Sequence, residues 1–241
     1  AQDANGAVRT VWMDDACVNS YPDHYVQSST LHPMQHLGDL IRERGYGAKR
    51  IGVELDNYYF SAKACRALEE RLPDALLVDA TGLVNWQRTI KSDEELAYMR
   101  KAARISEKII DGIAERVEPG LLKHELVAEI YADAIRGIDA DWGDYPAIVP
   151  LMPSGSDAAA PHLTWNGDPM REGEATFFEL SGCYRRYHAP LCRTVFLGKE
   201  DDGVYGFFHE ALDFLAGPCP AVDDLVAMAL RVGEVNLRVM E

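Results

Sequence analysis

Several features that mark particular classes of protein are missing from this 241-residue sequence. Five cysteines are present, but none belongs to a C-x-x-C pair, which argues against a zinc knuckle and a disulfide framework. We therefore expect reduced, mostly buried thiols. No apolar run approaches the roughly 18 residues of a membrane-spanning helix, and the first residues do not resemble a secretory signal. We expect a cytoplasmic protein without a membrane partner.

Positive charge is also scarce. Lys and Arg total 24 against 39 Asp and Glu, which gives a formal net charge of −15. Such a chain is poorly suited to phosphate backbones and anionic surfaces, so a nucleic-acid partner is not expected either. Hydrophobic residue types make up 47% of the chain, which is enough to build the core of one large domain or two modest ones.

Residues 1–90 predict a small α/β domain. The order of strand-like and helix-like patterns favours a sheet whose strands are at least partly parallel. The expected strands cover residues 7–18, 50–55 and 75–79, and the expected helices cover residues 32–44 and 61–72.

Residues 91–241 predict an α+β domain. Ser92 and Glu95 have the spacing of a capping box, which starts a long helix that ends before the Pro-Gly pair at residues 119–120. The expected elements after it are a helix over residues 124–136, a β-like stretch at 147–149, a small-residue loop over 153–162 with a strand behind it, two strands within 174–198 that turn near Gly182, and helices over 202–216 and 222–240.

The sequence has no nucleotide-binding glycine loop, serine elbow or HExxH motif. Two other residues are candidates for a catalytic role. His162 ends a loop that contains Pro and Gly, and rigid backbone there can aim its imidazole into a cleft as a general acid or base. Glu179 lies among aromatic and aliphatic residues, where a carboxylate is costly to bury unless it is paired or functional. A surface-loop histidine and a glutamate on a solvated strand face are the alternative interpretations. Strand alternation puts Phe177 on the face of Glu179, which argues against a fully solvated face.

A set of motifs in fixed order resembles the superfamily of prolidase, aminopeptidase P and creatinase. The resemblance implies a pita-bread catalytic domain, partial here over residues 91–241 and incomplete at its C-terminal side, behind a partial N-terminal domain over residues 1–90. It also implies a homodimer. The motifs are residues 51–54 (IGVE), 76–79 (LLVD), 90–95 (IKSDEE), 99–102 (MRKA), 118–120 (EPG), 154–162 (SGSDAAAPH) and 192–196 (CRTVF).

The same resemblance bears on metal use. Metal-dependent members bind two metal ions through an Asp, a second Asp eleven residues later, and a His and two Glu further on. The first position is Glu179 here and the second is Pro190, which has no side-chain donor. The resemblance therefore implies a site with no metal ion and no organic cofactor, as in the creatinase branch, where the histidine that matches His162 does the acid–base work.

Within that branch, residues 21–28, 143–150, 161–165 and 178–188 are most similar to hydrolases of a compatible solute, ectoine. The implied reaction opens the cyclic amidine of ectoine to N-acetyl-diaminobutyrate. In it, Glu179 holds the amidinium or assists attack on it, and His162 passes protons to the departing ring nitrogen. The aromatic side chains expected to bind the substrate are those of Trp165, Tyr187 and Tyr145.

Three alternative functions stay open at this level. One is a creatine-type amidinohydrolase, and a second is a dinuclear-metal Xaa-Pro aminopeptidase or prolidase. The third is a non-catalytic binding module that keeps the fold. Pro190 argues against the second, and the presence of both His162 and Glu179 argues against the third.

Overall fold

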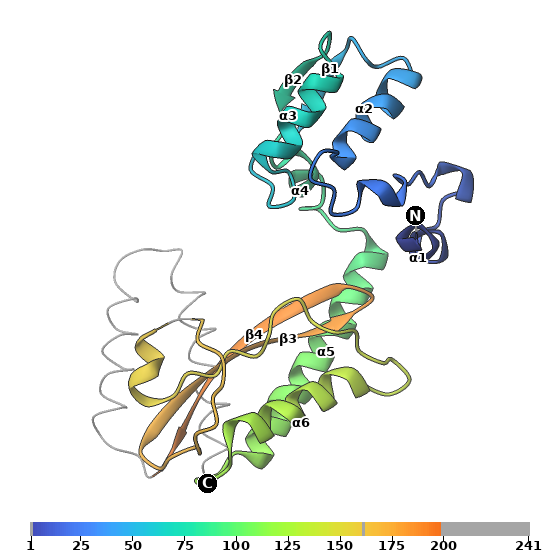
Figure 1. The fold of residues 1–241 in the computed structure, drawn as a ribbon. Coiled ribbons are helices and arrows are strands. Elements are labelled where there is room, and N and C mark those ends of the chain that lie inside the picture. The colour runs from blue at the N-terminus through green and yellow to red at the C-terminus, as the bar shows by residue number, and fades with distance from the viewer. Residues whose placement is uncertain (1, 161, 199–241) are drawn as a thin grey trace, which may run out of the picture. The chain divides into compact units, whose positions relative to one another are not determined.

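The computed structural model describes residues 2–160 and 162–198 (Figure 1). The chain forms two compact units that divide between Ile90 and Lys91. The helices expected over residues 202–216 and 222–240 lie outside the described residues, as does Cys219. No helix in the described part of the chain is both long and apolar enough to cross a membrane.

Unit 1 contains a parallel pair of strands packed against helices. Strand β1 (Arg50–Val53) pairs in parallel with β2 (Leu76–Asp79), and the same unit contains α2 (Pro33–Glu43), α3 (Ala62–Arg71) and α4 (Leu83–Gln87). Each of the two longer helices has a side-chain N-cap, because His32 accepts a bond from Met34 N and Ser61 accepts one from Ala64 N. The helices and strands expected over residues 32–79 are therefore confirmed.

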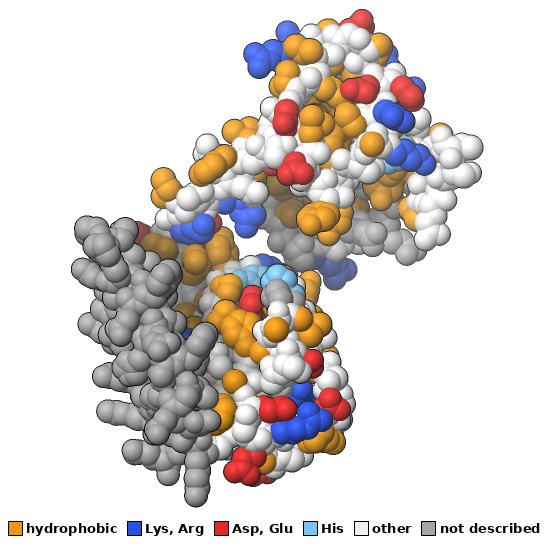
Figure 2. All heavy atoms as spheres, turned by 90° about the vertical axis from the view of Figure 1, so that its left-hand side faces the viewer, with side chains coloured by type: hydrophobic (Ala, Val, Ile, Leu, Met, Phe, Trp, Pro, Cys, Tyr) orange, Lys and Arg blue, Asp and Glu red, His pale blue; other side chains and the backbone are white. Residues whose placement is uncertain are grey.

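The side chains of Ile51 and Val53 lie on the face of this two-stranded sheet that packs against α3. Val53, Leu68 and Leu72 form its buried core, whereas Leu76 at the start of β2 is 59% exposed. Parallel sheets are usually covered on both faces. In this sheet the face that carries Leu76 leaves that apolar side chain exposed. Figure 2 shows hydrophobic side chains gathered on the surface of unit 1.

The strand expected over residues 7–18 is wrong. The structure has α1 (Gln2–Thr10) there, followed by the short 3-10 helices η1 (Asp15–Cys17) and η2 (Asp23–Tyr25). Local bonds hold these turns, since the Thr10 hydroxyl donates to Gly6 O and Asp14 accepts from Ala16 N. β-forming side chains favour a strand only where a neighbouring strand packs beside them. Trp12 is 93% exposed, which shows that this packing is missing.

Unit 2 is built on a long helix and a β-hairpin (Figure 1). Helix α5 (Asp93–Arg116) packs against α6 (Lys123–Arg136) and against the antiparallel strands β3 (Glu174–Tyr184) and β4 (Tyr187–Leu197). The Ser92–Glu95 capping box is confirmed, and so is the end of α6 at Gly137, where φ is +64°. The core contains Ile105, Ile109, Ile113, Leu126, Phe178 and Leu180, all at most 2% exposed.

The hairpin does not turn near Gly182 as the sequence suggested. Its two-residue turn is Arg185–Arg186, with φ values of +46° and +66°, and positive φ at both central positions is the signature of a type I′ hairpin turn. Gly182 lies inside β3 because α5 passes very close to it. A Cβ at this position would stand 2.4 Å from Ala102 O and 2.7 Å from Ser106 N.

Three smaller expectations are also wrong. Residues 147–149 form no strand, because pairing with β3 begins only at Leu151. No strand follows His162; the loop before it contains the 3-10 helix η3 (Gly155–Ala159) instead. The thiols are not mostly buried. Of the four cysteines in the described residues only Cys183 is buried, and none is in a disulfide.

Ser106 of α5 joins the helix to the hairpin. Its buried hydroxyl accepts a bond from Gly182 N at 2.7 Å and donates to Ala189 O at 2.6 Å. Gly182 and Ala189 are cross-strand partners. One hydroxyl therefore satisfies a buried donor and a buried acceptor of the hairpin, three pairs away from Glu179 on β3.

We expect Ser106→Ala to lower the free energy of unfolding by about 1–3 kcal/mol, the usual cost of leaving buried polar groups without a partner. Urea denaturation followed by tryptophan fluorescence measures this change. Ser156→Ala is the matched control, since Ser156 is exposed and surface substitutions usually change stability by less than about 0.5 kcal/mol. Equal stability of the two variants would contradict this role of Ser106.

Candidate active site

The candidate site begins with the face of the hairpin that points away from α5. Alternation along β3 sends Phe178, Leu180 and Tyr184 into the core, so Phe177 and Glu179 lie together on the other face. The cross-strand partner of Glu179 is Cys192. This face, which we call the outer face, carries Phe177, Glu179, Ser181, Cys183, His188, Pro190, Cys192 and Thr194.

Glu179 has a neighbouring chain segment on each side, and its own backbone N–H and C=O are both bonded to only one of them. On one side it pairs with Cys192 of β4. On the other, Leu151 N donates to Glu179 O at 2.9 Å and Glu179 N donates to Leu151 O at 3.1 Å. Phe177 N also donates to Pro153 O, so residues 151–154 act as a third strand. The partly buried carboxylate of Glu179 therefore projects from the middle of a rigid layer.

His162 lies next to this layer. Leu163 O accepts a bond from Met152 N at 3.1 Å, which places His162 beside the segment that pairs with Glu179. Since neighbouring strands lie about 4.8 Å apart, the backbones of Leu163 and Glu179 are on the order of 10 Å apart. The His162 side chain is exposed, and its φ of +67° is uncommon for a residue other than glycine. The fold thus brings the two predicted catalytic residues into one region.

The three aromatic candidates lie in different surroundings. Trp165 packs edge-on against Tyr131 of α6 and lies at the margin of the core. The Tyr187 hydroxyl donates to Glu95 at 2.9 Å, on the α5 side of the hairpin and therefore opposite the outer face. Tyr145 is 69% exposed, with the Arg186 guanidinium 4.0 Å from its ring centroid. Of the three residues, Tyr145 is the most exposed to solvent.

The contact of Tyr187 has an electrostatic effect on the capping box. Glu95 accepts bonds from Ser92 N and from the Tyr187 hydroxyl. These bonds favour the ionised carboxylate and hold the pKa of Glu95 below its usual value, with the Ser92 backbone bond as the larger cause. Tyr187 thereby links the start of α5 to the hairpin.

Sequence reasoning missed Cys192 and His188 as members of the outer face. A turn near Gly182 would have set Glu179 opposite Arg185, whereas the real turn sets it opposite Cys192. Cys192 is exposed as a residue, but partial desolvation of its thiol raises the pKa of that group, and the negative charge of Glu179 raises it further. The signal that identifies both residues is the register of the hairpin.

The residues of the outer face do not fit a two-metal centre. Ser181 pairs with Pro190 and Glu179 pairs with Cys192, so Pro190 is the diagonal neighbour of Glu179 on one face. A carboxylate at Pro190 would stand beside Glu179, but proline offers no side-chain donor. Within residues 2–160 and 162–198, no three His, Cys, Asp or Glu side chains are grouped as metal ligands.

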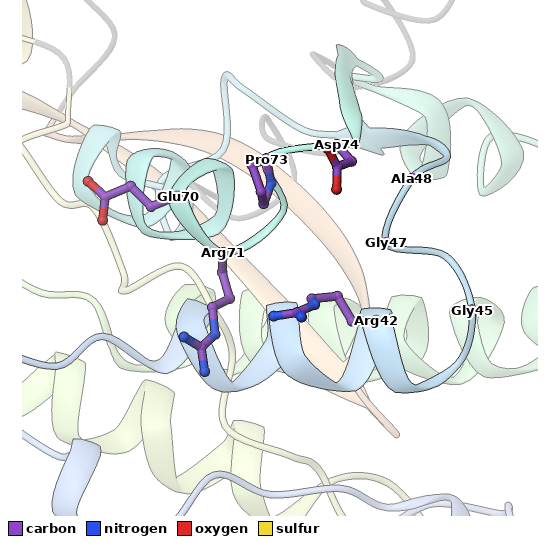
Figure 3. A pocket seen from close by; sticks show the side chains of 8 residues that line it. All are labelled: Arg42, Gly45, Gly47, Ala48, Glu70, Arg71, Pro73 and Asp74. Atoms are coloured by element: carbon purple, nitrogen blue, oxygen red, sulfur yellow. The ribbon is translucent and has the colours of Figure 1, made fainter.

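A cavity of about 440 Å³ lies in unit 1 between the C-terminal ends of α2 and α3 (Figure 3). Figure 3 shows Arg42 and Arg71 next to each other, with Glu70 pointing away from them. Arg71 makes two bonds to Asp39, at 2.6 and 2.8 Å, so its charge is already paired. All the residues that line this cavity belong to unit 1, whereas Glu179 and His162 belong to unit 2.

Comparison with known proteins finds relatives that are named as hydrolases or peptidases. The chain is 53% identical over 203 residues to ectoine hydrolase of Halomonas elongata. The aligned region covers 82% of this chain and 51% of that protein. It is 36% identical over 198 residues to an uncharacterized hydrolase/peptidase of Sinorhizobium fredii. That alignment covers 82% of this chain and 50% of the relative. The chain thus spans about half the length of these curated relatives.

The fold also matches solved structures. X-Pro aminopeptidase of Thermotoga maritima superposes with a TM-score of 0.70 at 18% identity, over 88% of this chain and 55% of that one. This likeness confirms the expected α+β pita-bread fold behind a smaller α/β domain. The sequence model of the creatinase/prolidase N-terminal domain matches residues 3–90, and that of metallopeptidase family M24 matches residues 97–218. The chain therefore belongs to metallopeptidase family M24 and carries a creatinase/prolidase N-terminal domain in front of the M24 region.

Proposed function

We propose that the full-length protein hydrolyses ectoine to N-acetyl-diaminobutyrate without a metal ion, as a step of compatible-solute degradation. The observation that carries this proposal is the outer face of the hairpin, which holds the carboxylate of Glu179 next to Pro190 instead of a second carboxylate. The similarity to ectoine hydrolase of Halomonas elongata supports the substrate.

The chemistry of the substrate suits one carboxylate and one imidazole. An amidinium is planar and cationic, so Glu179 binds it and orients its central carbon for attack by water. The oxygen of water bonds to that carbon, one ring C–N bond breaks, and the electron pair of that bond stays on the departing nitrogen. His162 delivers a proton to this nitrogen and recovers one from the attacking water.

The remaining features of the proposal concern the whole protein. It keeps a domain boundary near residue 90, with the N-terminal domain over residues 1–90 and the catalytic domain from residue 91 onward, in a cytoplasmic homodimer. Among the aromatic candidates, Tyr145 is the best supported substrate contact because it is the most exposed residue of the three. Trp165 and Tyr187 are partly buried by their contacts with Tyr131 and Glu95.

The test is product formation by full-length protein. We expect ectoine to give N-acetyl-diaminobutyrate, detected by NMR or mass spectrometry, at a rate that a chelator does not change. Elemental analysis of the active protein is expected to find less than one transition-metal ion per chain, because Pro190 supplies no ligand. Glu179→Asp is expected to leave the metal content unchanged for the same reason.

Two results would contradict the proposal. Two bound metal ions per chain together with loss of activity in chelator would place the protein among the metal-dependent members of its family. Hydrolysis of Xaa-Pro peptides, or of creatine, in place of ectoine would assign a different substrate to the same fold.

A further inference from the structure

The segment between Asp144 and Leu151 forms an arch above the hairpin. Asp144 N donates to Cys183 O at 2.9 Å, and Leu151 pairs with Glu179. These two anchor points are four residues apart on β3 but seven residues apart in the segment, so residues 145–150 have to bulge away from the strand. The middle of the arch contacts His188, which lies on the outer face together with Glu179. The arch therefore leans over the face of the candidate site.

Both ring nitrogens of His188 are engaged in this contact. Ala147 N donates to Nε2 at 2.9 Å, which requires Nε2 to carry no proton. Nδ1 lies 3.1 Å from the Arg186 carbonyl oxygen, which only accepts, so Nδ1 has to carry the proton. The bond at Nε2 therefore selects the neutral imidazole protonated on Nδ1, and the Arg186 carbonyl oxygen, closer to Nδ1 than the Cys183 sulfur at 3.9 Å, accepts that proton.

The beginning of the arch is fixed separately by Arg186. Its backbone N donates to the Asp144 carboxylate at 3.1 Å, and its guanidinium donates to Tyr145 O at 2.6 Å. These bonds hold residues 144 and 145 at the hairpin turn. His188 holds the next part, at Ala147, and from there the arch continues to Leu151 and the backbone of Glu179.

We propose that His188 is a positioning residue for the active site. As the neutral Nδ1–H tautomer it fastens the arch at Ala147, and this fastening sets where the arch stands over Glu179 and the bound substrate. The effect on turnover rests on the proposed hydrolysis of ectoine, whereas the tautomer and the fastening do not. His188 does not touch substrate in this role, because both of its ring nitrogens are already bonded to the protein.

The first test is spectroscopic and needs no substrate. In full-length protein labelled with ¹⁵N histidine, ring spectra are expected to show His188 protonated on Nδ1 and bare on Nε2, with its signals identified by their loss in His188→Gln. A ring protonated on Nε2, or a rapid mixture of the two tautomers, would overturn the proposal.

The second test measures the fastening of Ala147 itself. Without its acceptor, the amide of Ala147 is expected to exchange with deuterium on the order of two- to tenfold faster in His188→Ala, as loss of one hydrogen bond implies. His188→Gln places an amide oxygen near the position of Nε2 and is expected to restore the protection. Equal exchange in wild type and His188→Ala would show that His188 does not fasten the arch.

The third test connects the arch to catalysis. His188→Ala is expected to lower kcat/KM for ectoine on the order of tenfold to a hundredfold, in the range that small misplacements of site residues produce, and His188→Gln is expected to recover most of it. His124→Ala is the matched control, since His124 is exposed on α6 and only approaches its neighbour Glu125. Faster exchange at Ala147 with unchanged kcat/KM would refute the positioning role. Absence of ectoine hydrolysis by the wild type would instead refute the proposed function and leave the first two tests intact.

Discussion

Full-length protein with His162→Ala is expected to turn over ectoine more slowly by a factor on the order of 10²–10⁴, the usual contribution of a positioned general acid–base. The departing ring nitrogen needs a proton as the C–N bond breaks, and in the proposed reaction His162, which lies beside the Glu179 layer, supplies it. Steady-state kinetics on ectoine measures the change, with the fall expected in kcat because proton transfer belongs to the chemical step.

His124→Ala provides the control for this result. Both histidines are exposed residues of unit 2, but His124 lies on α6, where its Nε2 is 3.6 Å from the carboxylate of Glu125 in the same helix. We expect its turnover to match that of the wild type. Circular dichroism establishes that both variants are folded. A folded His162→Ala protein with wild-type kcat would make His162 an ordinary loop residue.

Glu179→Gln is expected to lower kcat/KM for ectoine on the order of 10²–10³-fold, the loss typical of one preorganised electrostatic group. Glutamine keeps the size of the side chain and its ability to accept a hydrogen bond, but it lacks the negative charge. Because the amidinium is a cation, loss of the charge weakens binding, slows attack on the central carbon, or does both. Separate values of kcat and KM distinguish these effects.

Glu174→Gln is the matched control for Glu179. Glu174 lies at the start of the same strand, five residues away, and pairs with Leu197 on the α5 side of the hairpin. Its carboxylate approaches Arg171 at 3.7 Å and takes no part in the outer face. We expect its kinetics to equal those of the wild type. Unchanged kcat and KM in Glu179→Gln would remove Glu179 from the active site.

Local signals in the sequence determined most of the helices. Ser92 and Glu95 begin α5 by bonding each other's backbone N–H groups, and this requires only four consecutive residues. Gly137 ends α6 with a positive φ, again a property of one residue and its neighbours. The shared face of Phe177 and Glu179 follows from the alternation of a strand, and the lack of a donor at Pro190 follows from its residue type.

The register of the hairpin was decided by tertiary structure. In the sequence, Gly182 is the natural turn residue, and two arginines are poor candidates for a turn with positive φ. In the fold, α5 passes so close to β3 that a side chain at Gly182 would collide with Ala102 O. The glycine is therefore needed within the strand, and the turn moves to Arg185 and Arg186. This shift brings Cys192 opposite Glu179.

The surroundings of the site depend on the same kind of long-range contact. Leu151 pairs with Glu179, Ala147 donates to His188, and Ser106 bonds Gly182, over separations of 28, 41 and 76 residues in the sequence. The sequence determined which side chains are present and which ends of the helices are capped, because those interactions join residues close in the chain. Only the fold decided which segments lie beside Glu179, because such pairings follow from packing of the whole unit.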